Sequence, residues 1–544
     1  MEKASTLSPP LPTTPAPSDR VESWKEIGTY LNRDVRTVQR WEQTKGLPVR
    51  RLPGGEMARV YALKSELDAW WNSRGIHLRE AVSPESLPSI VVLPFDNLSP
   101  DRENEYFSDG LADDIIDALT KLPGLRVIAR TSAFAFKGKD VDVSEIGARL
   151  KVDTVLEGSV RRTGSRIRVS AQLIRTADQS HLWSEHYDRE ITDVFAIQDE
   201  ISRAIVEKLR VHLAGDRPLV KRHTENLEAY NLFLRGRYCL LRVTPQSFAK
   251  GKEYLEHALA LDPNYALAYT GLAEYYRTSA FWGVMRGSET MPRAKAAALA
   301  ALKVDDTLAE AHTLLGAARG VGDFDWVEAE QEFRRALELN PASPTVHFYY
   351  EADCLRPTGR LGDALSEVQR VVELDPLSGR YNACLGYLYD LAGQHELASE
   401  QAKGATDLDP NMYMPRFILA MAYGHMGRYE AAIAEAQKAC ELCGSNSRAI
   451  GLLAWLYGMA GQRGESLALL EELTTQRRTG YVPPSAMVLA YRGLGEVDQV
   501  LEWLEKGVEE RDLMIVSNIR VEPLLVEQGH PRYHALLRKM NLEN

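Results

Sequence analysis

Hydrophobic residues follow a helical spacing through the second half of the chain. Between positions 225 and 544, glycines recur at one constant interval, at Gly359, Gly393, Gly427, Gly461 and Gly495. A glycine permits the backbone to reverse between the two helices of a pair, and a period of about 34 residues is typical of helix–turn–helix repeats. The pattern predicts an all-α solenoid of about eight repeats over residues 225–544.

Residues 89–215 have a different pattern, in which short apolar runs alternate with helical segments. The run Ser89–Phe95 is long enough only for a buried strand. The pattern predicts further strands at 126–129, 154–161, 166–174 and 181–187, and helices at 107–120, 143–150 and 194–213. Thr163-Gly164-Ser165 is a hairpin turn signal. We therefore expect an α/β domain with a mixed sheet.

Residues 21–75 predict a winged helix-turn-helix, after a Pro- and Ser-rich tail at 1–20 and before a linker at 76–88. Trp24, Ile27 and Leu31 form one helical stripe, and Asp34 is placed to cap a second helix. Two strands at 49–52 and 59–62, joined around a Pro-Gly-Gly turn, would form the wing. The side chains left to face DNA are Arg36, Thr37, Gln39 and Arg40 on the second helix, and Arg50, Arg51 and Arg59 on the wing.

The charge distribution supports a local contact with DNA. The formal charge of the whole chain is −11, which argues against nonspecific coating of nucleic acid. Between Arg33 and Lys64, however, there are eight basic and three acidic residues. The alternative is that these arginines are only a solvated face of a small helical domain. We predict double-stranded DNA as a partner of this region.

Each region resembles a known family. Thr37–Glu42, Gly46-Leu47 and Arg59–Tyr61 resemble the MerR and excisionase type of winged helix, which implies a recognition helix in the major groove and wing arginines on phosphate. Gln39 stands where MerR proteins usually carry Arg, and no dimerising coiled coil follows. Val91–Phe95, Tyr106–Ile116 and Leu156–Val160 resemble the TolB N-terminal-like domain, an interaction or sensing module. The glycine register resembles tetratricopeptide repeats, whose concave face binds extended peptides or helices.

The glycine register also predicts which side chains line that concave face. We expect a protein or peptide partner to contact Tyr349, Asp353, Arg356, Arg380, Tyr387, Asp390, Phe417, Met421 and Trp455. Aromatic, Met and Arg side chains are common at binding hot spots. The alternative for Phe417, Met421 and Trp455 is that they only pack neighbouring repeats together.

Motifs for catalysis and for metal binding are absent from the sequence. It contains no GxxxxGK[ST], GxSxG or HExxH pattern, so we expect no enzymatic activity, no cofactor and no metal site. Asp109, Asp113, Asp114 and Asp117 are interpreted as carboxylates that oppose a helix dipole. Cys440 and Cys443 form an isolated CxxC that lacks a second ligand pair.

Cysteine usage and hydropathy bear on localisation. The five cysteines are an odd number that fits reduced thiols, and no stretch of 18 apolar residues occurs. We expect a cytoplasmic protein without a membrane segment.

The combined prediction is a DNA-binding transcriptional regulator in which the α/β domain and the repeats receive a signal. The alternatives are an interaction scaffold that does not bind DNA and an accessory protein of adenylate cyclase signalling. The operator, the effector, the repeat partner and the oligomeric state stay open.

Overall fold

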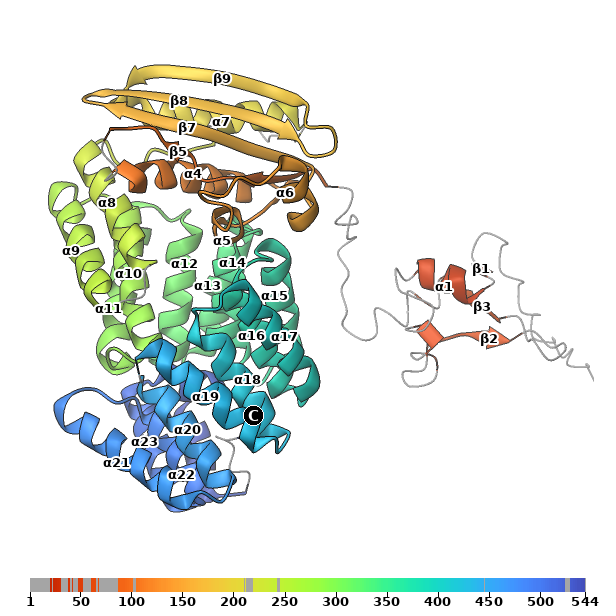
Figure 1. Ribbon diagram of the computed structural model, residues 1–544, viewed down its shortest axis with the longest axis vertical. Coiled ribbons are helices and arrows are strands. Elements are labelled where there is room, and N and C mark those ends of the chain that lie inside the picture. Colours follow the sequence, from red (N-terminus) through yellow and green to blue (C-terminus); the bar gives the residue numbers. More distant parts are fainter. Residues whose placement is uncertain are drawn as a thin grey trace, which may run out of the picture. The chain divides into compact units, whose positions relative to one another are not determined.

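The computed structural model contains two compact units, residues 1–86 and residues 87–544 (Figure 1). The boundary lies inside the segment 76–88 that the sequence analysis assigns to a linker. The structure describes residues 20–21, 23–30, 38–39, 42, 47–51, 60–64, 67, 87–100, 104–209, 211, 219–241, 245–444, 446–523 and 529–543.

The first unit contains a small antiparallel sheet and a helix. Strands β1 (Arg20–Val21), β2 (Arg50–Arg51) and β3 (Val60–Leu63) pair in the order β1-β3-β2. Helix α1 (Trp24–Tyr30) contributes the fully buried Ile27 to a core that also contains Val21, Val38, Leu47, Val60, Ala62 and Leu67. The antiparallel pairing of β2 with β3 agrees with the two strands predicted at 49–52 and 59–62.

The second unit begins with a six-stranded mixed sheet. Its strands are β4 (Ser89–Val92), β5 (Asp96–Asn97), β6 (Arg126–Val127), β7 (Thr154–Thr163), β8 (Arg166–Arg175) and β9 (His181–Glu190). Strand β4 pairs in parallel with β6 and β7, β5 pairs in parallel with β7, and β7, β8 and β9 are antiparallel. Gly164 has a φ of 61° in the turn between β7 and β8. The mixed sheet and its hairpin are confirmed.

Helices cover both faces of this sheet. They are α4 (Glu105–Thr120), α5 (Arg130–Phe134), α6 (Val143–Leu150) and α7 (Val194–Lys208). Ile90 and Val92 of β4 share a hydrophobic cluster with residues of α4 and α7, whereas Val91 packs with residues of α5 and α6. All four residues of β4 are buried, as the apolar run predicts.

Helix pairs fill the rest of the second unit. They are α8 (Leu227–Leu240), α9 (Pro245–Leu261), α10 (Ala266–Phe281), α11 (Gly287–Val304), α12 (Ala309–Ala317), α13 (Trp326–Leu339), α14 (Pro344–Tyr350), α15 (Leu361–Leu374), α16 (Gly379–Leu391), α17 (His395–Leu408), α18 (Tyr413–His425), α19 (Tyr429–Cys443), α20 (Ser447–Met459), α21 (Arg463–Thr479), α22 (Pro484–Leu494), α23 (Val497–Glu510), α24 (Leu513–Asn518) and α25 (Pro531–Lys539). Two π-helical segments, η5 (Ala318–Asp323) and η6 (Glu351–Leu355), extend α12 and α14. No helix of the described residues is long and apolar enough to cross a membrane.

The repeat glycines have the backbone conformation that their spacing predicts. All five of these evenly spaced glycines have φ between 72° and 80°. Because L side chains are strained at such angles, glycine is favoured at each of these turns. Ala364, Ala398 and Ala432, each five positions after one of these glycines, are fully buried between helices. The helix–turn–helix register is therefore confirmed.

The α/β domain packs directly on the repeats, with α4 between the sheet and the repeat helices (Figure 1). The Ser132 backbone N–H donates to Asp375 Oδ1 at 2.7 Å, and the Leu377 N–H donates to Ser132 Oγ at 2.8 Å. Asn340 Nδ2 donates to Thr120 Oγ1 at 3.2 Å. These buried polar contacts join the α/β domain and the repeats in one unit.

Candidate functional site

The exposed strand β2 carries two of the predicted DNA-binding residues. Arg50 lies opposite Tyr61 and Arg51 opposite Val60 in the pairing with β3, and both arginines are exposed. Arg51 Nη1 lies 2.7 Å from Glu42 Oε1. Gln39 is helical and partly exposed. The other predicted contacts, Arg36, Thr37, Arg40 and Arg59, lie outside the described residues.

The predicted partner-binding residues of the repeats lie in the interior. Eight of the nine are buried, and Arg380 is partly buried. Arg277, a residue that the sequence analysis did not select, forms a buried ion pair with Asp353, in which Nε and Nη2 lie 2.9 and 3.0 Å from Oδ2 and Oδ1. Its guanidinium carbon lies 3.7 Å from the centre of the Tyr349 ring. These side chains are therefore occupied by contacts within the chain.

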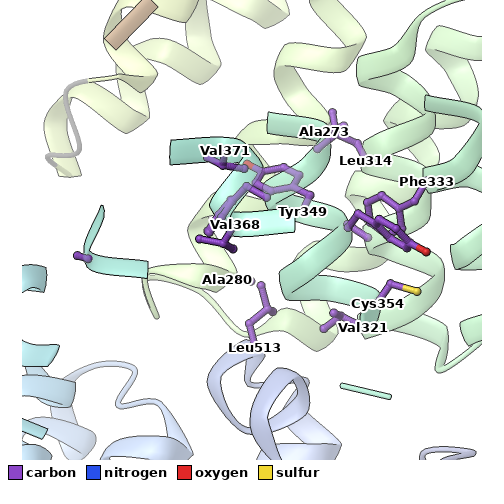
Figure 2. Close-up of a cluster of buried hydrophobic side chains, with 14 of the residues drawn as sticks. Ala273, Ala280, Leu314, Val321, Phe333, Tyr349, Cys354, Val368, Val371 and Leu513 are labelled. Carbon is purple, nitrogen blue, oxygen red and sulfur yellow. The ribbon is translucent and has the colours of Figure 1, made fainter. Parts of the chain in front are cut away.

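The C-terminal segment covers this inner face. Arg356 Nη1 donates to Asn518 Oδ1 at 2.9 Å, and the Tyr387 hydroxyl donates to Glu522 Oε2 at 2.9 Å. Figure 2 shows Leu513 of α24 in the same hydrophobic cluster as Ala280 of α10. The expectation of an open groove at the predicted positions is therefore wrong, because the chain folds its own C-terminal residues against them. The repeat register predicted residues 511–523 as further repeat and gave no signal of this role.

The aspartates of α4 also have a different role from the predicted one. Asp113 pairs with Arg237 of α8 and lies 3.4 Å from Arg130, while Asp114 accepts a hydrogen bond of 2.6 Å from the Tyr230 hydroxyl of α8. Burial raises the pKa of Asp114 to about 6. A helix dipole acts mainly on the first turn, and both aspartates follow that turn. The dipole interpretation is therefore wrong for them, and they hold the α/β domain on the first repeat.

The other two acidic positions of α4 are paired as well. Asp117 Oδ2 lies 2.6 Å from Lys121 Nζ, and Asp109 Oδ1 lies 2.6 Å from Lys137 Nζ. Each carboxylate therefore has a cationic partner within the α/β domain. This pairing explains the acidic cluster without a ligand.

Removing the Arg237 side chain tests the interface between α4 and α8. We expect Arg237→Ala to lower the free energy of unfolding by about 2 kcal/mol, because two largely buried carboxylates lose a charged donor. Urea denaturation followed by circular dichroism measures the change. Arg335→Ala, which removes an exposed partner of Glu338 on α13, should cost less than about 0.5 kcal/mol. Equal losses in the two variants would contradict the interface.

A cavity of about 610 Å³ lies where the β7–β8 turn meets α8. Its lining includes Tyr106, Arg162, Asn231 and Arg235. The guanidinium carbon of Arg235 lies 4.9 Å from the centre of the Tyr106 ring. The Glu228 carboxylate also lines the cavity, so the lining combines two guanidinium groups, an aromatic ring, an amide and an acidic group.

Comparisons with known proteins show that two parts of the chain are similar to known families. Residues 86–204 match the family described as "HilA/YgeH-like transcriptional regulator, second domain", and residues 416–446 match the tetratricopeptide repeat family. The chain thus carries a domain similar to one of a transcriptional regulator, followed by tetratricopeptide repeats. A tetratricopeptide repeat protein of known structure from Parabacteroides merdae is 15% identical, with a TM-score of 0.33, over 45% of this chain and 98% of that chain.

Two curated relatives are similar over part of their length. A segment of 188 residues, 34% of this chain, is 47% identical to "Putative adenylate cyclase 3" of Rhizobium meliloti (strain 1021) and covers 32% of it. A segment of 296 residues, 53% of this chain, is 23% identical to "Transcriptional regulator HilA" of Salmonella typhimurium and covers 51% of it. The chain spans about a third of the first relative and about half of the second.

Proposed function

We propose that this chain is a DNA-binding transcriptional regulator without enzymatic activity. The observation that carries the proposal is the match of residues 86–204 to a regulator domain, downstream of a separate unit with an exposed, arginine-bearing strand. In this proposal the first unit is a winged helix-turn-helix of the MerR type. Its Arg36, Thr37, Gln39 and Arg40 read bases, and its Arg50, Arg51 and Arg59 hold phosphates.

The second unit receives the signal in this proposal. The α/β domain, which resembles the TolB N-terminal-like domain, is packed on the repeats through buried contacts, so a ligand bound to one can affect the other. The cavity lined by Arg162, Arg235 and Glu228 is the site proposed for a small polar effector. A protein partner of the repeats would bind outside the inner positions that the C-terminal segment covers.

Salt-dependent DNA binding tests the proposal. We expect the purified full chain to bind promoter fragments, and the Arg50→Ala/Arg51→Ala variant to bind with a slope of log K against log salt that is smaller by about 2, because two phosphate contacts are lost. Arg40→Ala should instead reduce discrimination between sequences, by about 1 to 3 kcal/mol. Fluorescence anisotropy with labelled duplexes at several salt concentrations measures both effects.

A charge-matched variant provides the control for this experiment. Arg463→Ala/Arg532→Ala removes two exposed arginines from the repeats and changes the net charge by the same amount. Its salt slope should equal that of the unmodified chain. The absence of DNA binding at low salt, or equal slopes in the two double variants, would favour the scaffold that does not bind DNA.

A role in nucleotide signalling is the second candidate function. It is favoured by the 47% identity to a segment of a protein named as a putative adenylate cyclase. In that case the shared segment would be a regulatory module used beside a cyclase. Stimulation of a cyclase by the added chain, without DNA binding by the chain, would support this candidate over the first.

A further inference from the structure

Two histidines and an aspartate meet where α16, α17 and α18 come together. His395 Nδ1 lies 2.7 Å from Asp390 Oδ1, and His425 Nδ1 lies 2.9 Å from Asp390 Oδ2, both within hydrogen-bond distance. Asp390, His395 and His425 each offer one potential metal-ligand atom, and these three atoms lie within 4.8 Å of one another. The two imidazoles therefore converge on a single carboxylate.

The repeat fold does not require these residue types. Positions that lie a whole number of repeats before or after them in the glycine register carry other side chains. For Asp390 these are Arg356, Gly424, Gly458 and Arg492, for His395 they are Leu361, Tyr429, Arg463 and Val497, and for His425 they are Leu391, Met459 and Gly493. The cluster is therefore a departure from the repeat pattern at one junction.

Asp390 is a buried carboxylate that lies between two imidazoles. Its carboxylate is fully buried, and the ion-pair partners that the described residues offer it are the two histidines. A buried carboxylate is costly unless a cation lies beside it.

A further carboxylate stands on the outer side of His425. His425 Nε2 is buried without a hydrogen-bond partner and lies 4.0 Å from Glu522 Oε1. Metal-bound histidines commonly donate their second N–H to a carboxylate, which fixes the tautomer in which the other nitrogen is free to coordinate. Glu522 is placed for this role.

We propose that Asp390, His395 and His425 bind a divalent transition-metal ion of the zinc type. Both imidazoles would coordinate through Nδ1, and Asp390 through one oxygen, with water as a fourth ligand. Zinc–nitrogen bonds are about 2.0 to 2.1 Å long, so the side chains must turn from their present hydrogen bonds to admit the ion. Two nitrogen ligands out of three favour zinc over magnesium or calcium, which prefer oxygen. The His395 side chain is 28% exposed, which provides a route from solvent.

Zinc titration of the full chain tests the proposal. A Cys440→Ser/Cys443→Ser background removes the thiol pair as a competing ligand set. After treatment with a chelator, calorimetry with Zn²⁺ should give one ion per chain at this site. His395→Gln should weaken binding by more than about 100-fold, and Glu522→Gln by about 10- to 100-fold as an outer partner. Co²⁺ should give visible absorption bands in the background protein and not in His395→Gln.

His312→Gln is the matched control. His312 Nδ1 lies 2.6 Å from Glu332, so this histidine has a carboxylate partner like that of His395 but belongs to no three-residue cluster among the described residues. Zinc affinity should be unchanged in this variant. Circular dichroism melts establish that each variant is folded. Asp390→Asn removes a second proposed ligand and should also weaken zinc binding. Failure to bind zinc, or equal affinities in His395→Gln and His312→Gln, would overturn the proposal.

Discussion

Replacing Asp353 with Ala is expected to lower the free energy of unfolding of the chain by about 3 to 5 kcal/mol. The side chains of Asp353 and Arg277 are each 1% exposed, and two hydrogen bonds join them. Loss of the carboxylate leaves the Arg277 guanidinium buried without its charged partner. Such a buried charge without its hydrogen-bonded partner costs more than the pair itself contributes. Urea denaturation monitored by circular dichroism gives the change.

A double variant distinguishes the contribution of the Arg277–Asp353 ion pair from the cost of leaving Arg277 charged and buried alone. Arg277→Met/Asp353→Leu should recover most of the lost stability, because well-packed apolar side chains can replace a buried ion pair. Glu505→Ala provides the exposed comparison: Glu505 and Arg532 form a two-bond pair with both side chains 39% exposed, and its loss should cost less than about 1 kcal/mol. A cost for Asp353→Ala no larger than that for Glu505→Ala would contradict the buried position of the Arg277–Asp353 pair.

Local patterns predicted the elements of the second unit well. The helix at 143–150 and the antiparallel strands after residue 154 lie where the residue spacing placed them, since amphipathic spacing and turn residues act over a few positions. The repeat glycines predicted both the register and the positive φ of each turn. These features depend on short segments that the sequence displays directly.

Long-range contacts could not be predicted in the same way. The sequence shows Tyr387 as a large polar aromatic on an inner helix, but not that Glu522, 135 residues later, accepts its hydrogen bond. Likewise, Asp113 lies near the middle of an acidic helix, and its partner Arg237 lies 124 residues away. A single sequence offers no pairing information over such separations. The residues predicted to line a groove are therefore buried inside the second unit. The carboxylates predicted to oppose a helix dipole, Asp113 and Asp114, lie at the interface between the α/β domain and the repeats.

The stability of the chain is expected to fall as the pH rises from about 4.5 to about 7, through Glu351. Burial within η6 raises the pKa of this carboxyl from 4.5 to about 7, and Asp353 raises it further, while the neighbouring Arg356 opposes the shift. The folded state therefore keeps a proton that the unfolded state releases in this window. The stability that this proton contributes is fully present below the unfolded pKa and is lost as the pH rises through the folded pKa. The total loss in the free energy of unfolding is about 3 kcal/mol.

Urea denaturation of Glu351→Gln at several pH values between about 4.5 and 8 isolates this contribution. Glutamine keeps the shape of the side chain and does not titrate. As the pH rises, the unmodified chain should therefore lose unfolding free energy relative to the variant. Glu505→Gln tests the sign, since Arg532 lowers the pKa of Glu505 and its contribution is lost as the pH falls. The difference in unfolding free energy between Glu351→Gln and the unmodified chain could instead stay constant across this pH range. That result would show that Glu351 titrates normally and is not held in the buried position beside Arg356.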